Sequence, residues 1–223
     1  MTPRAAERPL VIALPKGRLL ADTLALCAAA GLDFGGEREA ARRLRLAAST
    51  GGAQALLVKP PDVLTYVEHG IADLGVIGKD VLLETPGDVD EPLDLGFGAC
   101  RLVVAGPAGA TARDLDAWSD VRVATKYPEA TRRHFAARGR LVEVIELSGS
   151  VELGPITGLS EWIVDLVETG ETLRQNGLVV VEEVARCSAR LIVNRASRKT
   201  RFETVDALVR AFRKEAKARA TRR

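Results

Sequence analysis

The sequence is poor in the residues from which disulfide frameworks, zinc sites and histidine-based catalysis are built. Its 223 residues include only three cysteines and two histidines. Cys27, Cys100 and Cys187 are odd in number, far apart and not in a metal-ligand spacing, which predicts free buried thiols in a reducing compartment. His69 at a predicted helix end and His134 beside two arginines are expected at the surface. The sequence therefore predicts no metal site and no hydrolase triad, and it lacks a Gly-x-Gly-x-x-Gly loop for a dinucleotide.

Long apolar runs and a strong net charge are also lacking. No apolar stretch approaches the roughly 20 residues that cross a bilayer. The short stretch 10–14 is followed by no small-residue cleavage site, so we expect a cytoplasmic protein with neither a membrane nor a secretory segment. The formal net charge is only +2 and the one basic cluster is the tail 213–223, so nucleic acid is not an expected partner.

The sequence does contain a regular alternation of short apolar runs with amphipathic stretches. Hydrophobic residues make up 47% and charged residues 28%, as in an ordinary globular protein. The first unit has a predicted strand at 10–14, a turn at 15–18 and a helix at 19–30. Residues 85–91 are predicted as a loop, and residues 157–162 as a short helix. Such alternation is typical of βαβ units around mainly parallel sheets, so the predicted fold class is α/β.

Two long extended segments, 93–104 and 178–193, divide this α/β pattern into two halves. They predict two lobes with a double crossover, each with a mainly parallel sheet flanked by helices, similar to the type II periplasmic-binding-protein fold. Lobe I would comprise residues 1–100 plus 188–223, and lobe II residues 101–187. We expect the site in the cleft between the lobes.

The segment 163–173 carries the most informative chemistry. An apolar strand runs into a turn whose Thr169 and Gly170 precede a helix, where unpaired backbone N–H groups and the helix dipole favour a phosphate. Gly170 permits close backbone approach, and the hydroxyls of Thr169 and Thr172 can donate to phosphate oxygens. Asp165, at the end of the strand, would then face a ribose. An equally good interpretation of the two threonines is that they are ordinary helix N-caps.

The pattern around this segment resembles the signature of the ATP phosphoribosyltransferase family. It begins at Glu152 and continues through Gly158, Ser160, Ile163, Asp165-Leu166, Thr169-Gly170 and Thr172-Leu173. Four other blocks resemble family blocks in the family's order: 13–18, 62–68, 72–81 and 124–128. The resemblance therefore covers nearly the whole chain.

In this family the Thr-Gly-x-Thr loop holds the 5-phosphate of phosphoribosyl pyrophosphate (PRPP). The PRPP-binding residues that the resemblance implies are Glu161, Asp165, Glu168, Thr169, Gly170, Glu171, Thr172 and Leu173. Glu168 and Glu171 must point outward, since their charges oppose a bound phosphate. Relatives commonly carry Asp where this chain has Glu161, and a solvated helix acid is the alternative for that position.

The resemblance also implies cations for the pyrophosphate and the ATP triphosphate. Lys16, Arg18 and Lys59 are the expected catalytic residues, although many relatives carry Arg at position 59 and Lys offers a point charge rather than a fork. The expected ATP-binding residues are Lys16, Gly17, Asp73, Gly75, Ser148, Gly149 and Ser150. For Asp73 a structural role in capping a turn is an equally good interpretation. Mg²⁺ is expected to bind with PRPP and ATP.

The function that the resemblance implies is transfer of the 5-phosphoribosyl group of PRPP to N1 of ATP, with release of pyrophosphate. This reaction is the first step of histidine biosynthesis. The chain resembles the short catalytic form, which implies a homodimer within a hetero-oligomer that includes a regulatory subunit similar to histidyl-tRNA synthetase. Two alternatives are a two-lobed solute-binding module and a phosphoribosyltransferase for another base.

Overall fold

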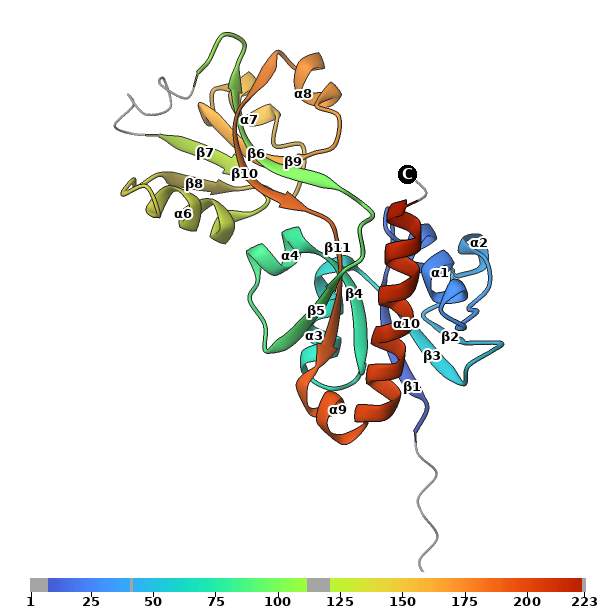
Figure 1. The fold of residues 1–223 in the computed structure, drawn as a ribbon. Helices are drawn as coiled ribbons and strands as arrows, with labels where there is room; N and C mark the ends of the chain where they lie inside the picture. The colour runs from blue at the N-terminus through green and yellow to red at the C-terminus, as the bar shows by residue number, and fades with distance from the viewer. Residues whose placement is uncertain (1–7, 41, 112–120, 222–223) are drawn as a thin grey trace, which may run out of the picture. The chain divides into compact units, whose positions relative to one another are not determined.

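The chain forms two compact units, each built around its own sheet (Figure 1). The computed structural model describes residues 8–40, 42–111 and 121–221. The first unit comprises Met1–Leu82, Pro86–Gly98 and Ser188–Arg223, and the second comprises Leu83–Thr85 and Ala99–Cys187. Apart from the short segment Leu83–Thr85, the chain enters the second unit after Gly98 and returns to the first unit after Cys187.

The first unit has a six-stranded mixed sheet in the order β2-β3-β1-β4-β11-β5. Its strands are β1 (Leu10–Pro15), β2 (Arg45–Ala47), β3 (Ala53–Val58), β4 (Leu74–Gly78), β5 (Val89–Asp94) and β11 (Ala189–Asn194). β3, β1 and β4 are parallel neighbours, whereas β11 runs antiparallel to both β4 and β5. The carboxyl ends of β1, β3 and β4 therefore meet at one edge of the sheet.

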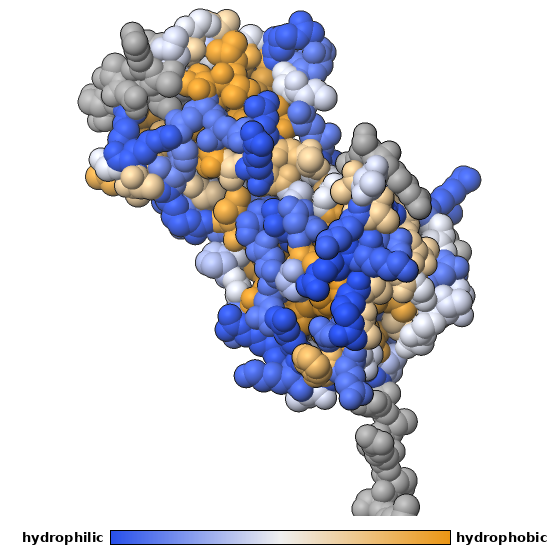
Figure 2. Space-filling view, viewed as in Figure 1, coloured by the Kyte–Doolittle hydropathy of each residue, from blue (hydrophilic) through white to orange (hydrophobic). Residues whose placement is uncertain are grey.

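Helices cover both faces of this sheet because β1 is apolar on both sides. Ile12 packs with α1 and α10 residues in one core cluster, whereas Val11 and Ala13 pack with α3 in another. The helices are α1 (Leu20–Ala29), α2 (Glu37–Ala40), α3 (Pro60–Glu68), α4 (Lys79–Glu84), α9 (Arg195–Thr200) and α10 (Phe202–Thr221). The long helix α10 contacts α1, as Figure 1 shows. Hydrophilic residues cover much of the visible face of both units (Figure 2).

The second unit has a five-stranded sheet in the order β10-β6-β9-β7-β8. Its strands are β6 (Cys100–Pro107), β7 (Arg122–Thr125), β8 (Glu143–Glu146), β9 (Trp162–Val167) and β10 (Leu178–Cys187), and its helices are α6 (Pro128–Ala136), α7 (Leu153–Thr157) and α8 (Glu171–Gln175). β9, β7 and β8 are parallel. Along β9, Trp162 and Val164 face the core under α6, whereas Ile163 and Val167 face the core that includes Leu173 of α8.

These sheets and helices confirm the predicted α/β fold class, but both sheets are mixed and not mainly parallel as expected. Two local elements also differ. Residues 85–91 were expected to be a loop, but β5 begins at Val89. This edge strand has no apolar alternation; it forms because β11 supplies backbone partners and Arg190, Arg195 and Arg198 pair with its carboxylates. The helix expected at 157–162 lies earlier, at Leu153–Thr157, because Gly158 adopts a left-handed conformation (φ +74°) that ends it. Within the described residues, no helix is long and apolar enough to cross a membrane.

Candidate functional site

A pocket of about 400 Å³ lies where β9 leads into α8. It is lined by Glu152 and by the continuous run Asp165, Leu166, Val167, Glu168, Thr169, Gly170, Glu171, Thr172 and Leu173. Glu168, Thr169 and Thr172 are exposed, whereas Leu173 is buried in the core and fixes α8 against the sheet. The segment predicted to bind the 5-phosphate of PRPP thus forms an open, polar pocket.

The turn of this pocket presents backbone donors. Gly170 is the N-cap of α8 with φ +79°, a left-handed conformation that costs a side chain about 1–2 kcal/mol. Its carbonyl accepts a hydrogen bond from Arg174 N (3.0 Å), so the helix begins here. Thr169 Oγ1 accepts from Glu171 N (3.4 Å). The amides of the first turn that follow have no partner within the helix and carry its positive dipole end, which suits an anion.

The Glu171 carboxylate lines the pocket but is paired along α8. Its carboxylate accepts hydrogen bonds from Arg174 Nη2 (2.7 Å) and Gln175 Nε2 (2.8 Å), both on α8. The Arg174 guanidinium and then the Gln175 amide hold the pKa of the Glu171 carboxyl below its usual range. Its charge is therefore balanced along the helix, and the repulsion against a phosphate is reduced.

Asp165 lies on the middle of β9, on the sheet face that carries α8. Its pKa is raised above the ordinary aspartate value, first by burial and also by the neighbouring carboxylate of Glu152, while the Leu166 amide and the charge of Lys126 act in the opposite direction. Sequence reasoning gave Glu152 no role, although it is the first residue of the signature. The structure brings Glu152 and Asp165 to one pocket, where two carboxylates can accept hydrogen bonds from sugar hydroxyls.

We expect Asp165→Asn to raise the melting temperature at pH 7.5 while lowering kcat/KM for PRPP by at least about 10-fold. Because the folded-state pKa is raised, ionisation of this carboxyl costs folding free energy at neutral pH. That cost is fully present above the folded-state pKa and disappears as the pH falls below the ordinary value of 3.8. Calorimetric melts from pH 7.5 down to pH 4 should therefore show the advantage of the variant shrinking. An advantage that grows toward acid pH would contradict this account.

The segment Ser148, Gly149 and Ser150 follows β8 at the same sheet edge as the pocket. Leu147 N donates to Thr125 O (2.9 Å), which extends the parallel pairing of β7 and β8 to the start of this loop. All three residues are exposed, and Ser150 has a φ of +48°, an uncommon conformation for a residue with a side chain. Strained loop residues of this kind are frequent at functional sites.

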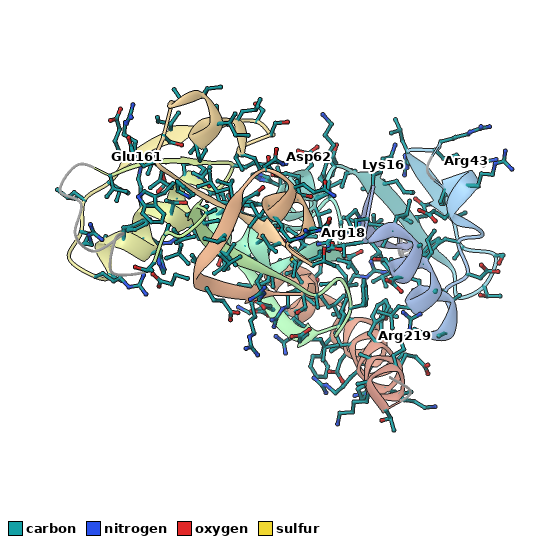
Figure 3. The ribbon with its side chains drawn as sticks, turned by 90° about the horizontal axis from the view of Figure 1, so that it is seen from above. Lys16, Arg18, Arg43, Asp62, Glu161 and Arg219 are labelled. Carbon is teal, nitrogen blue, oxygen red and sulfur yellow. The ribbon has the colours of Figure 1, made fainter. Side chains whose placement is uncertain are left out.

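The predicted cations of the first unit lie at the carboxyl edge of its parallel strands. β1 and β3 are in register from Leu10 to Pro15, and Lys16 N donates to Val58 O (2.8 Å), so Lys16 and Lys59 follow adjacent strands. Lys59 is the exposed N-cap of α3. Gly17 has φ +89° and open space around its Cα, and Arg18 is exposed beside it at the start of α1 (Figure 3). The structure brings Lys16, Gly17, Arg18 and Lys59 together as a cationic edge.

The structure does not bring Glu161 to the pocket at residues 165–173, where its contact with PRPP was predicted. Glu161 precedes β9 at its amino end, and with about 3.3 Å per strand residue it lies roughly 13 Å along the strand from Asp165. Its carboxylate accepts from Arg122 N (3.1 Å) and pairs with the Arg122 guanidinium, whose hydrogen bond lowers the pKa of Glu161. Glu161 also lines a different pocket, of about 420 Å³, together with Trp162.

The predicted ATP contacts of Asp73 and Gly75 do not fit their positions either. Asp73 precedes the amino end of β4, its side chain has no exposed surface, and its carboxylate pairs with Arg8 (2.8 Å) and Arg201 (3.0 Å). The structural alternative is the one the contacts support. Gly75 is buried inside β4, where a Cβ would lie 2.7 Å from the side chains of Val63 and Val67. It is a glycine because α3 packs closely on the sheet.

Comparisons with known proteins agree with this site. The family model described as ATP phosphoribosyltransferase (HisG) matches residues 59–214. An ATP phosphoribosyltransferase of Geobacter metallireducens is 50% identical over 207 residues, which cover 92% of this chain and 97% of that protein. The ATP phosphoribosyl transferase (HisG:HisZ) complex from Thermotoga maritima contains a chain that is 34% identical, with a TM-score of 0.81 over 94% of this chain and 99% of that chain.

A more distant neighbour shares the fold alone. The periplasmic aliphatic sulphonate binding protein SsuA from Escherichia coli is 14% identical with a TM-score of 0.59, covering 97% of this chain and 76% of that chain. This similarity bears out the predicted likeness to the periplasmic-binding-protein fold. The family model and the relative at half identity agree on one assignment. This chain belongs to the ATP phosphoribosyltransferase family.

Proposed function

We propose that this chain transfers the 5-phosphoribosyl group of PRPP to N1 of ATP and releases pyrophosphate, as the first step of histidine biosynthesis. The observation that carries the proposal is the pocket at residues 165–173. In this pocket the left-handed Gly170 and the exposed Thr169 and Thr172 lie at the start of α8, and the half-buried Asp165 lines the same pocket. Such a pocket suits a phosphate joined to a sugar, and the family supplies the reaction.

Within this pocket we assign the phosphate and the ribose to separate groups. The amides and hydroxyls from Thr169 to Leu173 bind the 5-phosphate, where donors at a helix start are already oriented. Asp165 and Glu152 accept hydrogen bonds from the ribose hydroxyls. Their negative charges also stabilise the positive charge that builds up on the ribose as the bond at C1 breaks. Both carboxylates line the same pocket as the threonines.

The cationic edge of the first unit binds the two most highly charged groups of the reaction. Lys16, Arg18 and Lys59 neutralise the ATP triphosphate and the departing pyrophosphate. The exposed segment 148–150 and Gly17 approach the nucleotide through their backbones. N1 of adenine has a free lone pair, so the reaction requires no strong general base. Catalysis rests on placement and electrostatics, and no single residue has the role of a triad serine.

The donor set of the pocket fits a Mg²⁺ ion that arrives with its substrates. Among the described residues no group of three or more His, Cys, Asp or Glu could hold a metal by itself. Asp165 and Glu152 supply two hard carboxylates, and Mg²⁺ typically combines one or two of these with substrate phosphates. When bound, Mg²⁺ would neutralise charge on the pyrophosphate.

For its assembly and location, we propose a homodimer within a cytoplasmic hetero-oligomer that includes a regulatory subunit similar to histidyl-tRNA synthetase. The similar chain from Thermotoga maritima was solved in a HisG:HisZ complex. The three cysteines are free and buried, as in proteins of reducing compartments. Co-expression with such a subunit from the same genome and size-exclusion chromatography test the assembly. Separate elution of the two chains would argue against it.

The proposed reaction is tested by pyrophosphate release with four nucleophiles offered separately: ATP, adenine, guanine and orotate. We expect release with ATP alone, in the presence of PRPP and Mg²⁺. Activity only with a free base would reject ATP as the acceptor, because the phosphate pocket would then serve a different nucleophile. The product with ATP should retain the triphosphate, which mass spectrometry can verify.

A further inference from the structure

We propose that Lys126 is a further substrate-binding residue, whose ammonium group contacts the diphosphate of PRPP. The inference rests on the proposed function, because it places one more group in the same phosphoribosyl pocket. Lys126 follows β7 directly and is exposed. It is also the single lysine in residues 99–187 of the sequence.

The sheet register places Lys126 beside Asp165. Thr125 pairs with Val164 in the parallel β7 and β9, so the next residue on each chain is Lys126 and Asp165. Ala124 lies in the core on the α8 face, and side chains alternate along a strand, so Lys126 and Asp165 project on that same face. The charge of Lys126 lowers the pKa of Asp165, which agrees with this proximity.

The backbone on either side of Lys126 is fixed by buried hydrogen bonds. Thr125 Oγ1 donates to Val164 O (2.7 Å) and accepts from Tyr127 N (2.9 Å). Thr131 Oγ1 donates to Tyr127 O (2.7 Å), and Thr125 and Thr131 have no exposed surface. A lysine held between two anchored residues starts from a defined position at the sheet edge, so only its side chain must be ordered when an anion binds.

The charge balance of the pocket calls for a cation on this face. The pocket lining includes four acids, Glu152, Asp165, Glu168 and Glu171, and no lysine or arginine among the described lining residues. Most arginines of the second unit are already engaged: Arg101 and Arg186 with Glu183, Arg122 with Glu161, Arg132 with Glu129, Arg138 with Glu182 and Arg174 with Glu171. Arg133 lies on α6, which packs on the opposite face.

The Lys126 ammonium, by contrast, has no hydrogen bond or ion pair to any residue in the described part of the chain. In the proposed function, the 5-phosphate is bound by amides and hydroxyls of residues 169–173, which follow the carboxyl end of β9. Lys126 lies instead level with Asp165, the residue assigned to the ribose. The anionic group nearest to it is then the diphosphate at C1, where negative charge increases as the bond breaks and a lysine stabilises it as a point charge.

The test compares Lys126→Gln and Lys126→Arg with Lys199→Gln, which removes the same charge from an exposed position on α9. For Lys126→Gln we expect the KM for PRPP to rise about 10- to 100-fold, the loss of one charged hydrogen bond, with the KM for ATP within about 3-fold. Titration with pyrophosphate should show a similar loss of affinity, and titration with ribose 5-phosphate little change. Lys126→Arg should retain most of the affinity, and Lys199→Gln all of it.

Unchanged pyrophosphate affinity in Lys126→Gln, with an unchanged melting temperature, would overturn the inference. A loss confined to ribose 5-phosphate would also overturn it, because the lysine would then serve the 5-phosphate. These outcomes differ from failure of the proposed function, in which the unaltered protein itself would neither bind PRPP nor release pyrophosphate with ATP.

Discussion

The double variant Gly170→Ala with Thr172→Ala is expected to raise the KM for PRPP by about 100-fold and the KM for ATP by less than about 3-fold. Gly170 has φ +79°, so alanine costs about 1–2 kcal/mol there or moves the turn. The nearest atom to a new Cβ is Val167 Cγ1 at 3.7 Å, so the cost comes from the backbone conformation and not from a clash. Thr172 loses a hydroxyl donor to a charged phosphate, worth about 1.5–3 kcal/mol.

Matched controls separate phosphate binding from general damage. Gly139 also has a positive φ (+69°) with open space around it, so Gly139→Ala imposes the same backbone strain far from the pocket. Thr200→Ala removes a helix hydroxyl that donates to Ala196 O (3.0 Å) of the preceding turn. Steady-state kinetics with each substrate varied in turn should leave both controls unchanged. Equal increases in the two Michaelis constants of the double variant would mean that the turn supports the fold and does not anchor the phosphate.

The pocket at residues 165–173 lies in the segment that the sequence singled out, because the determinants of this segment are local. The apolar run of β9, Gly170 at a helix start and the two threonines lie next to one another in the chain, and the signature fixes their spacing. The α/β class was predictable for the same reason, since strand and helix periodicities are short-range patterns. The pocket partner Glu152 could have been found as well, because the signature begins with it.

The predicted site residues that the structure places elsewhere are those whose contacts come from distant parts of the chain. Glu161 was predicted to bind PRPP because relatives commonly carry Asp at that position. It lies at the amino end of β9, where Arg122 of the neighbouring β7 pairs with it. Gly75 was assigned to the nucleotide because glycines permit close approach. What approaches it is the side of α3, from a segment earlier in the chain. The type of a single residue does not tell at which end of a strand it lies, or which helix packs on it.

Asp73 is the third such case, and replacing it has the largest expected effect on stability. Its buried carboxylate accepts from Arg8 (2.8 Å), Ser197 Oγ (2.8 Å) and Arg201 Nη1 (3.0 Å), and also from Val11 N (2.9 Å). These groups come from both ends of the chain, so one carboxylate joins β1, β4 and α9. Asp73→Ala would leave Arg201, which is only 13% exposed, without a counterion.

We expect Asp73→Ala to lower the free energy of unfolding by about 3–5 kcal/mol, the usual cost of breaking a buried ion pair on one side. For a chain of this size that is roughly 6–20 °C in melting temperature. Asp73→Asn should lose less, because the amide oxygen still accepts one of the hydrogen bonds. The exposed pair between Asp206 and Arg210 on α10 provides the control, and Asp206→Asn should cost less than about 1 kcal/mol.

Kinetics below the melting transition decide between the two roles of Asp73. Because the carboxylate lies at the amino end of β4, away from the edge where Lys16 and Lys59 follow their strands, the folded fraction of Asp73→Ala should keep its KM for ATP within about 2-fold. Its kcat, corrected for folded fraction by circular dichroism, should be retained as well. A rise of 10-fold or more in the KM for ATP, without a change in melting temperature, would return Asp73 to the nucleotide site and contradict the buried network as its function.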